Sequence, residues 1–548
     1  MNWRYLFLII TITGAYLVLF LHLYKIQLQQ GNYYLGRAES QYLASGLLEA
    51  KRGTIYFSDK NGNHLAVAVN KNFPIIYAVP SVMEDIPGTV QRLAALFPQT
   101  TLDLEKGLYR KGSSYYLLQR KADPGIAAKI DNEKIKGVYV GSVPERFYPF
   151  GTLAAHLLGF VGADSSGLAE NGKYGLEKFY DDMLGGVSGK TDGGEIIQPH
   201  DGEDLVLTID PNIQMEAERI LGALVKDSKG TGGEVIVEEP ATGKILALGG
   251  YPNFDPNNFN QGNIGDFLNP TVQKIYEPGS VLKVITMAAG IDSGVITPQT
   301  TYMDTGTLVI NGRRISNYDL KKHGPYGLAT MTNVIEHSIN TGAVFAEGKI
   351  GNQVFRNYLV KFGFQQKTGI DLPGELTGSL KPLFARGAPQ VAFATASYGQ
   401  GIAVTATELL SAMAAITNDG MMMRPYVNSA LGPKEAGRVI SASAAKQVTD
   451  MMVSAVDKAD VAAIKGYSLA GKTGTAYIPD FKKGGYTDKV VDTYIGFGPT
   501  SNPRFIALIK VDGLSDTQLA ALTVVPSFRD LAQFILNYYN VPPDRISQ

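Results

Sequence analysis

The sequence has no cysteine among its 548 residues, and this absence excludes disulfide bonds and thiolate chemistry. Its six histidines show no metal-ligand spacing and no H-E-x-x-H motif occurs, so no metal site is expected. Fifty basic and 51 acidic side chains leave a formal net charge of -1, which gives no electrostatic basis for binding nucleic acid. The chain is too long for one ordinary hydrophobic core, so two or three domains are expected.

Charged side chains are also missing from one long segment near the N-terminus. Residues 5–24, YLFLIITITGAYLVLFLHLY, contain no Asp, Glu, Lys or Arg. A helix of this length spans about 30 Å, the hydrocarbon thickness of a bilayer. No small-x-small cleavage site follows, so an uncleaved signal-anchor is predicted, with residues 1–4 as a cytoplasmic tail. A buried core helix is the alternative. No later stretch is apolar and long enough to span, so residues 25–548 are expected on one side of the membrane.

A glycine- and aspartate-rich stretch divides the remaining chain. This stretch, MLGGVSGKTDGGEIIQPHDGED at residues 183–204, is the best candidate for a linker. Before it, residues 25–46 are polar and helical in pattern, and short strands and amphipathic helices follow. The expected modules are therefore residues 25–200 and 201–548.

The second module has strand patterns at both ends and helical patterns between them. Strands are expected in residues 204–210, 232–252, 467–478 and 492–512. Residues 232–252 and 492–512 each contain a turn between two apolar runs, which predicts two hairpins. A helix is expected at residues 526–539, with Pro526 in its first turn. Together these patterns predict an α+β fold: an antiparallel sheet built from early and late segments, flanked by helices and packed against an all-helical insert.

Residues 276–290, YEPGSVLKVITMAAG, place Ser280 and Lys283 three residues apart at the head of an apolar run. Residues three apart share one face of a helix, so the two side chains can meet. Lysine can take a proton from serine only when it is neutral, which requires that burial or a second cation lowers its pKa. The spacing alone leaves two readings open, because a serine at a helix start is commonly an N-cap.

Two further short motifs favour catalysis. EHSINTGAVF supplies Ser338 and Asn340 around Ile339, and LAGKTGTAY supplies residues 472–475 within a strand pattern. Lys472 can bind a substrate carboxylate as a point charge, and the hydroxyls of Thr473 and Thr475 can add hydrogen bonds. Gly474 is unfavourable inside a strand unless another backbone comes close, and a peptide substrate added along that edge is one such backbone.

Ser-x-x-Lys, Ser-x-Asn and Lys-Thr-Gly, in this order, are typical of penicillin-binding proteins and related β-lactamases. On these motifs the sequence resembles a class B penicillin-binding protein, a monofunctional peptidoglycan D,D-transpeptidase of division or elongation. Other stretches that carry the resemblance are ERFYPFGTLAAHLLGFVG, YGLEKFYDDMLGGVSG, GIDLPGE and SYGQGIAVTATELLSAMAAITNDG. Ile339 departs from the Asp that β-lactamases usually carry there.

The resemblance implies a pedestal or dimerisation-like domain at residues 25–200 and a transpeptidase domain at residues 201–548. It implies that Ser280 attacks the D-Ala-D-Ala donor of a stem pentapeptide and that Lys283 takes its proton. Ser338 and Asn340 would relay a proton and hold the peptide. The carboxylate would bind at residues 472–475, namely Lys472, Thr473, Gly474 and Thr475.

The resemblance also implies that the backbone N–H groups of Ser280 and Thr475 form an oxyanion hole. No metal or organic cofactor is needed for this chemistry. Besides the donor and acceptor stems, the implied partners are β-lactam inhibitors, a membrane glycosyltransferase and division or elongation proteins. The implied location is the bacterial inner membrane, crossed once, with the catalytic domain outside the cytoplasm.

Two other classes of function compete with this one. A β-lactamase or D,D-carboxypeptidase would need a base that holds water against the acyl-enzyme. Glu347 and Glu375 follow the second motif, but neither has the context of such a base, and Glu347 is expected to be a surface or structural charge. A penicillin sensor or inactive scaffold is the non-enzymatic alternative, and the intact motif residues argue against it.

Overall fold

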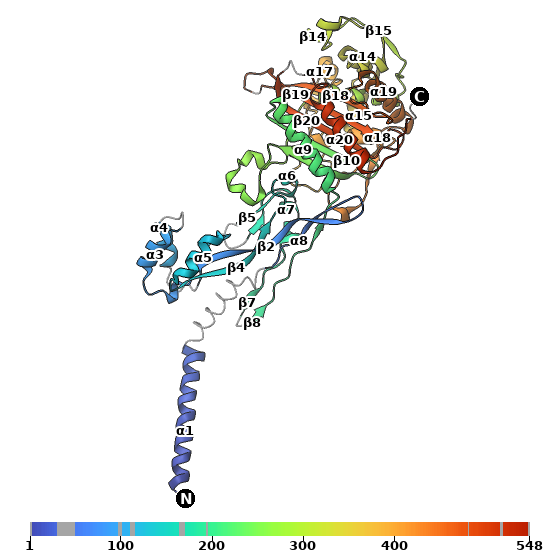
Figure 1. The fold of residues 1–548 in the computed structure, drawn as a ribbon. Helices are drawn as coiled ribbons and strands as arrows, with labels where there is room; N and C mark the ends of the chain where they lie inside the picture. The colour runs from blue at the N-terminus through green and yellow to red at the C-terminus, as the bar shows by residue number, and fades with distance from the viewer. Residues whose placement is uncertain are drawn as a thin grey trace. The chain divides into compact units, whose positions relative to one another are not determined.

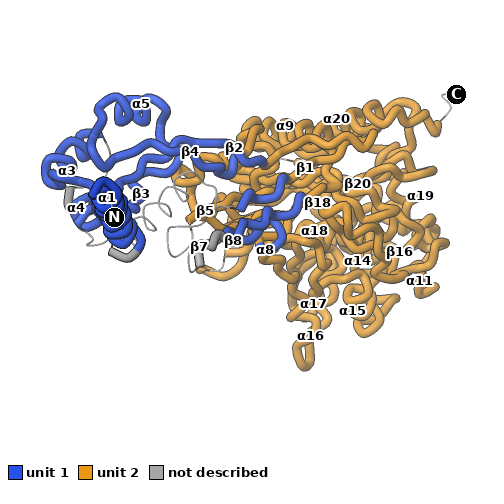
Figure 2. Tube along the Cα trace, turned by 90° about the horizontal axis from the view of Figure 1, so that it is seen from below, with its two compact units in different colours: residues 1–54, 69–147, 182–204 blue, residues 55–68, 148–181, 205–548 orange. Residues whose placement is uncertain are grey.

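The structure, a computed structural model, describes residues 3–29, 50–96, 101–109, 115–163, 170–192, 195–480, 482–515 and 519–545. The chain forms two compact units, which Figure 2 shows in different colours. Unit 1 comprises residues 1–54, 69–147 and 182–204, and unit 2 comprises residues 55–68, 148–181 and 205–548. The larger unit therefore includes two segments that come before the glycine-rich stretch.

Helix α1 (Trp3–Tyr24) confirms the helix predicted for the apolar N-terminal segment (Figure 1). Apart from Arg4 and His22, its side chains are mainly apolar on all sides, and none of them is buried against other parts of the chain. One turn of π-helix (Lys25–Gln29) follows. The rest of the polar helix predicted for residues 25–46 lies outside the described residues.

Unit 1 contains a small antiparallel sheet covered by helices. Residues 69–78 of β2 (His64–Ala78) pair with β4 (Val138–Phe147), and the end of β2 pairs with β3 (Tyr116–Gln119). The helices that pack on this sheet are α3 (Ile86–Ala94), α4 (Thr101–Leu108) and α5 (Pro124–Glu133). Their shared core explains the amphipathic patterns of this region.

The predicted linker is partly wrong. Within it, β7 (Lys190–Asp192) pairs antiparallel with β8 (Glu195–Ile197). Two short runs that flank Gly-Gly are a hairpin signal, and the threonine and isoleucine residues in these runs favour strands. Glycine content alone was therefore a poor guide here.

Unit 2 is built on the antiparallel sheet that the sequence predicts. Its strands follow the order β11-β10-β20-β19-β18. Their bounds are β10 (Gly232–Glu239), β11 (Lys244–Tyr251), β18 (Ala470–Pro479), β19 (Tyr486–Gly498) and β20 (Phe505–Ser515). Both predicted hairpins are confirmed, since β10 pairs with β11 and β19 pairs with β20. Strand β18 lies at one edge.

The strand predicted for residues 204–210 is shorter than expected and lies elsewhere. Only β9 (Leu205–Val206) forms, and it pairs in parallel with β1 (Ile55–Ser58) instead of joining the main sheet. Asp210, the last residue of the predicted strand, is instead the cap of the next helix and accepts hydrogen bonds from the backbone N–H groups of Asn212 and Ile213.

Helices cover both faces of the main sheet (Figure 1). Helices α9 (Pro211–Ser228) and α20 (Val524–Tyr538) pack on one face, against alternate residues of β20 such as Ile509 and Val511. Successive side chains of a strand point to opposite faces, so Leu508 and Lys510 face the helical insert. Tyr494 of β19 shares the α20 face, where its ring packs on Phe528.

The insert is mainly helical but not all-helical, which corrects the prediction. Its longer helices are α11 (Leu282–Asp292), α14 (Asn340–Ile350), α15 (Asn352–Lys361), α18 (Ala406–Thr417) and α19 (Ala442–Ala459). Three two-stranded ribbons also occur: β12 (Thr301–Asp304) with β15 (Gly327–Thr330), β13 (Thr307–Ile310) with β14 (Arg313–Ser316), and β16 (Met421–Met423) with β17 (Glu435–Arg438). Asn311 and Gly312, both with positive φ, turn the second ribbon, and this Asn-Gly pair is a hairpin signal in the sequence.

A buried ion cluster lies on the insert face of the main sheet. Lys510 is fully buried, and its Nζ lies 2.9 Å from Glu234 and 2.6 Å from Asp512. The same Nζ stands 4.7 Å from the ring centre of Tyr276, four residues before Ser280. Burial alone lowers the pKa of Lys510, but the two carboxylates outweigh it and raise the pKa. The ammonium therefore balances two buried acids.

Removing this ammonium should strongly destabilise unit 2. We expect Lys510→Ala to lower the free energy of unfolding by about 3–5 kcal/mol, because buried Glu234 loses its cation and Asp512 keeps only its contact with Lys274. Urea unfolding followed by circular dichroism measures the change. Lys446→Ala is the matched control: Lys446 pairs with Asp450 at the surface, so its loss should cost at most about 1 kcal/mol. Equal effects of the two substitutions would contradict the interpretation.

Candidate active site

Ser280 and Lys283 meet as the spacing predicts. Ser280 lies in a 3-10 turn (Gly279–Val281) that leads directly into α11, where Lys283 is the second residue. The Lys283 Nζ atom is 2.9 Å from the Ser280 Oγ atom. Every residue of α11 from Leu282 to Ile291 is buried, so the lysine side chain is surrounded by the apolar residues that its sequence context indicates.

Ser338 joins this pair to the edge strand. It lies between α13 (Met331–Glu336) and α14, and its φ of 55° is unusual for a residue other than glycine. Lys283 Nζ donates to the Ser338 carbonyl at 2.5 Å and lies 3.1 Å from its Oγ. Lys472 Nζ, from β18, donates to the same Oγ at 3.0 Å. The two lysines therefore share one hydroxyl oxygen.

The electrostatics of the two lysines differ. Burial lowers the pKa of Lys283 well below its usual value, nearby Lys472 lowers it further, and Asp319 opposes both effects. Burial also lowers the pKa of Lys472, to about 7. Two ammonium groups beside one hydroxyl would repel each other, so both burial and the charge of Lys472 disfavour the protonated form of Lys283. A neutral amine 2.9 Å from a serine hydroxyl has the geometry of a general base.

Two glycines let the serine turn approach the edge strand. A Cβ on Gly279, whose φ is +56°, would lie 2.7 Å from the Thr475 carbonyl oxygen. A Cβ on Gly474 would lie 2.8 Å from the Pro278 carbonyl oxygen. The backbone of the serine turn therefore comes close to Gly474, and the predicted approach of a substrate backbone along this edge stays a prediction.

The remaining predicted residues lie around this cluster. The Thr473 hydroxyl oxygen is 3.3 Å from Lys472 Nζ. Asn340 begins α14, and its Nδ2 donates to the Ser316 carbonyl at 2.9 Å. The Thr475 hydroxyl was expected to be available for a substrate carboxylate, but it donates to Asp492 at 2.7 Å. Of the two threonine hydroxyls, that of Thr473 lies beside Lys472 and that of Thr475 is bound to Asp492.

Sequence reasoning missed a carboxylate that supports the serine turn. Glu277, three residues before Ser280, accepts hydrogen bonds from the Gly401 N–H at 3.0 Å and from the Tyr486 hydroxyl at 3.1 Å. The first of these contacts ties the turn to the loop after α17 (Gln390–Ala396), and the second ties it to the start of β19. The quoted stretch YEPGS contains Glu277, but its partners are more than a hundred residues away, so no local pattern reveals them.

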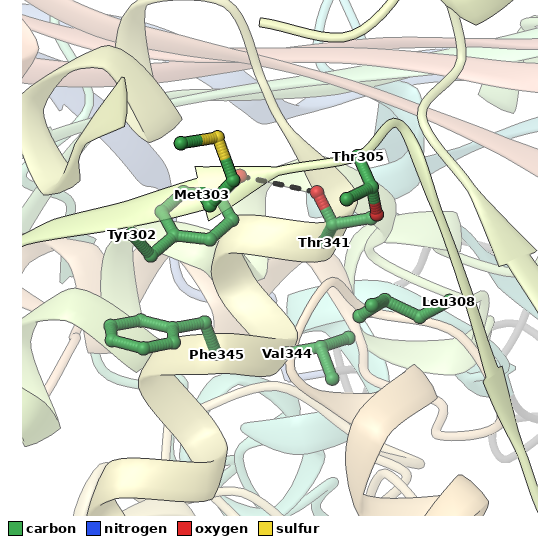
Figure 3. A pocket seen from close by; sticks show the side chains of 7 residues that line it. All are labelled: Tyr302, Met303, Thr305, Leu308, Thr341, Val344 and Phe345. Atoms are coloured by element: carbon green, nitrogen blue, oxygen red, sulfur yellow. Dashed lines mark hydrogen bonds between the residues drawn. The ribbon is translucent and has the colours of Figure 1, made fainter. Parts of the chain in front are cut away.

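A cavity of about 280 Å³ lies beside α14 (Figure 3). Its lining consists of Tyr302, Met303, Thr305, Leu308, Thr341, Val344 and Phe345. Thr341 directly follows Asn340, donates to Asp304 at 2.5 Å and lies 3.1 Å from the Tyr302 hydroxyl. Neither Ser280 nor the two lysines line the cavity, so it is separate from the serine and lysine cluster.

The two glutamates that were weighed as bases are both engaged in structural contacts. Glu347 is fully buried and not at the surface; burial raises its pKa to about 7, and Gln390 donates to it. Glu375 accepts hydrogen bonds from the backbone N–H and hydroxyl of Thr368. In the part of the chain that the structure describes, no group of three or more His, Asp or Glu side chains is arranged to hold a metal ion.

Comparison with known proteins gives one consistent result. Residues 233–530 match the family model of the penicillin binding protein transpeptidase domain, and residues 47–195 match that of the penicillin-binding protein dimerisation domain. Stage V sporulation protein D of Bacillus subtilis is 30% identical, over 98% of this chain and 86% of that protein. The peptidoglycan D,D-transpeptidase FtsI of Escherichia coli K12 is 29% identical, over 91% of this chain and 86% of its own length.

Solved structures agree with the sequence comparisons. Penicillin binding protein 3 of Mycobacterium tuberculosis, complexed with aztreonam, is 25% identical and superposes with a TM-score of 0.68. The match covers 91% of this chain and 98% of that one. A protein of Atopobium parvulum titled a putative peptidoglycan glycosyltransferase gives a TM-score of 0.69 at 27% identity.

The lowered pKa of Lys283 predicts a pH-dependent stability. Between that lowered value and the unfolded value of about 10.4, the unfolded chain binds one more proton at this residue, so stability rises with pH. Lys283→Met removes this slope. We expect its stability relative to wild type to fall by up to about 1.4 kcal/mol per pH unit between pH 7 and pH 9, measured by urea unfolding.

The control for this measurement is Lys446→Met. Lys446 is exposed beside Asp450, so its difference from wild type should stay constant across the same pH range. A constant difference for Lys283→Met as well would show that Lys283 is protonated in the folded protein.

Proposed function

Since this chain belongs to the class B penicillin-binding protein transpeptidases, we propose the roles of its own residues in cross-linking peptidoglycan stem peptides. The enzyme is a serine-type D,D-transpeptidase, and β-lactams inhibit this family by acylating the same serine. The observation that carries the assignment of roles is the position of the buried Lys283 amine, 2.9 Å from the Ser280 hydroxyl and linked through the Ser338 hydroxyl to Lys472.

In the acylation step, Ser280 is the nucleophile and Lys283 the general base. The serine proton moves to the neutral amine while Oγ forms a bond to the penultimate D-alanine carbonyl carbon. The bond between that carbon and the terminal D-alanine nitrogen then breaks. The proton passes through the Ser338 hydroxyl, which lies 3.1 Å from Lys283 Nζ, to the leaving amine. Terminal D-alanine leaves and an ester at Ser280 remains.

In the second step, an amino group of an acceptor stem attacks this ester. Its proton returns through Lys283 to the serine oxygen, the ester bond breaks, and the new amide is the cross-link. The backbone N–H groups of Ser280 and Thr475 stabilise the oxyanion of both tetrahedral intermediates. The close approach of Gly279 to Thr475 supports this pairing, because it brings the two backbone segments side by side.

Recognition of the donor relies on Lys472, Thr473 and Asn340. Lys472 supplies a positive charge for the terminal carboxylate, and the Thr473 hydroxyl beside it adds a hydrogen bond. Gly474 permits the close packing of the serine turn. Asn340 has its amide nitrogen fixed to Ser316, which leaves its carbonyl oxygen to accept from the donor peptide.

We further propose that α1 anchors the protein in the bacterial inner membrane, with residues 1–4 in the cytoplasm and residues 25–548 outside it. The 22-residue apolar helix, unburied against the rest of the chain, supports this topology. Residues 25–200 then form the pedestal domain and residues 201–548 the transpeptidase domain. A membrane glycosyltransferase and division or elongation proteins are the expected partners, since the chain cross-links glycan strands made elsewhere.

The roles of Ser280 and of water can be tested together. We expect Ser280→Ala to abolish covalent labelling by a fluorescent penicillin while the melting temperature stays nearly constant, because one hydroxyl is lost. In the wild type, the penicilloyl adduct should persist for many minutes after excess penicillin is removed, because Glu347 and Glu375, the two candidate bases for water, are held in structural contacts. Intact-mass spectrometry measures the labelling and the lifetime of the adduct, and thermal unfolding measures the melting temperature.

Two outcomes would contradict this assignment. Labelling of the Ser280→Ala protein at another serine would show that the nucleophile lies elsewhere. Loss of the wild-type adduct within seconds, with hydrolysed penicillin accumulating, would place the protein among the hydrolases.

The membrane topology has its own test. A protease added to spheroplasts should digest the catalytic domain and leave only a short fragment that contains α1. Immunoblotting with tags at each end of the chain follows the fragments, and a cytoplasmic protein that stays intact serves as the control for cell integrity. Full protection of the chain would contradict the proposed orientation.

A further inference from the structure

Asp492 is an acidic residue directly opposite Thr475 in the main sheet. Strands β18 and β19 are antiparallel, and Thr475 pairs with Asp492 in their register, so the two side chains lie on the same face. The Thr475 hydroxyl donates to Asp492 Oδ1 at 2.7 Å. A threonine hydroxyl has a single proton to donate, so this bond uses it.

The surroundings of Asp492 fix its carboxylate in place. Asp492 is fully buried, and its second oxygen, Oδ2, accepts a hydrogen bond at 2.9 Å from Thr523, the residue before α20. Burial raises the pKa of Asp492, and the two hydroxyl bonds oppose that rise. Within the described residues, Asp492 forms no salt bridge. Two threonine hydroxyls thus provide its side-chain hydrogen bonds, and rotating Thr475 away would remove one of them.

Thr473 provides the contrast on the same strand. It pairs with Tyr494, an aromatic neighbour on its own face that offers no carboxylate. Its hydroxyl oxygen lies 3.3 Å from Lys472 Nζ, on the side where the cation is. Two threonines two residues apart therefore have different roles because of the residues opposite them on β19.

We propose that Asp492 is a specificity-determining residue of the acyl-donor site: by holding the Thr475 hydroxyl, it prevents that hydroxyl from donating to a ligand carboxylate. Carboxylate recognition then depends on Lys472 and Thr473, and Thr475 contributes its backbone N–H alone. This inference rests on the proposed function, in which a carboxylate binds at Lys472.

Removing Asp492 has a defined chemical consequence. Without the buried carboxylate, the Thr475 hydroxyl is free to turn toward a ligand carboxylate and donate to it. A hydrogen bond to a charged group changes an affinity by about tenfold or more. The gain is larger for ligands that carry a carboxylate, because the carbonyl of a neutral ester accepts only a weaker, uncharged hydrogen bond. A merely structural role for Asp492 would change the reaction with both kinds of ligand equally.

The experiment compares two acylating ligands on the full-length protein in detergent. The second-order rate of acylation is measured with benzylpenicillin and with its neutral methyl ester, for wild type, Asp492→Ala and Asp492→Asn. We expect Asp492→Ala to raise the ratio of the rate with benzylpenicillin to the rate with the methyl ester about tenfold. Asp492→Asn should raise it much less, because its amide oxygen still accepts from Thr475. In a protein that already carries Thr475→Val, Asp492→Ala should no longer raise this ratio, because the hydroxyl that Asp492 holds is absent.

Each alternative outcome has a separate meaning. An unchanged ratio in Asp492→Ala, in a protein that penicillin still acylates at Ser280, would overturn the inference and leave the proposed function intact. Equal gains for the Ala and Asn variants would also overturn it, since they would show that the negative charge alone discriminates. Failure of penicillin to acylate the wild type at Ser280 would instead overturn the proposed function. If Asp492→Ala does not fold, the same two rates are measured for Asp492→Asn and for Asp492→Asn combined with Thr475→Val. Because the asparagine oxygen still accepts from Thr475, the inference predicts that Thr475→Val changes the rate ratio about as little in the Asp492→Asn protein as in the wild type.

Discussion

The burial of one amine, that of Lys283, is the constraint on which the site depends. A lysine in water is protonated and cannot take a proton from serine, so the fold must exclude water from it and place positive charge nearby. The continuous burial of α11 achieves the first condition, and Lys472 contributes to the second. The apolar residues after Ser280 are therefore part of the chemistry as well as part of the core.

The positions of Lys472 and Ser338 depend on which segments of the chain meet at the edge of the main sheet. Its edge strand β18 comes from the late part of the chain, whereas the serine turn comes from the early part, and Gly279 and Gly474 permit the two backbones to touch. Ser338 bridges them from between two insert helices, in a backbone conformation that few residues other than glycine adopt. Three local structures of different kinds thus meet at one hydroxyl group.

The sequence predicted those parts of the molecule that local patterns determine. A turn between two apolar runs predicted each hairpin of the main sheet, and the three motifs predicted the serine and lysine cluster. It did not predict contacts between distant segments. The hold of Asp492 on Thr475 depends on the register of two strands, and the glycine at 474 depends on a carbonyl almost two hundred residues earlier. The missed ribbon at Asn311 and Gly312 is different, because its turn signal was present in the sequence.

The lowered pKa of Lys472 has a further consequence: ligand binding changes the number of protons that the protein carries. Lys472 has a pKa of about 7, so near neutral pH only part of the free protein carries the ammonium form. An anion bound beside it favours that form, and the complex therefore takes up a fraction of a proton from the solution. The heat of binding a carboxylate should then depend on the ionisation enthalpy of the buffer, and the affinity should fall as the pH rises above 7. Binding of the substrate carboxylate is therefore coupled to protonation of Lys472.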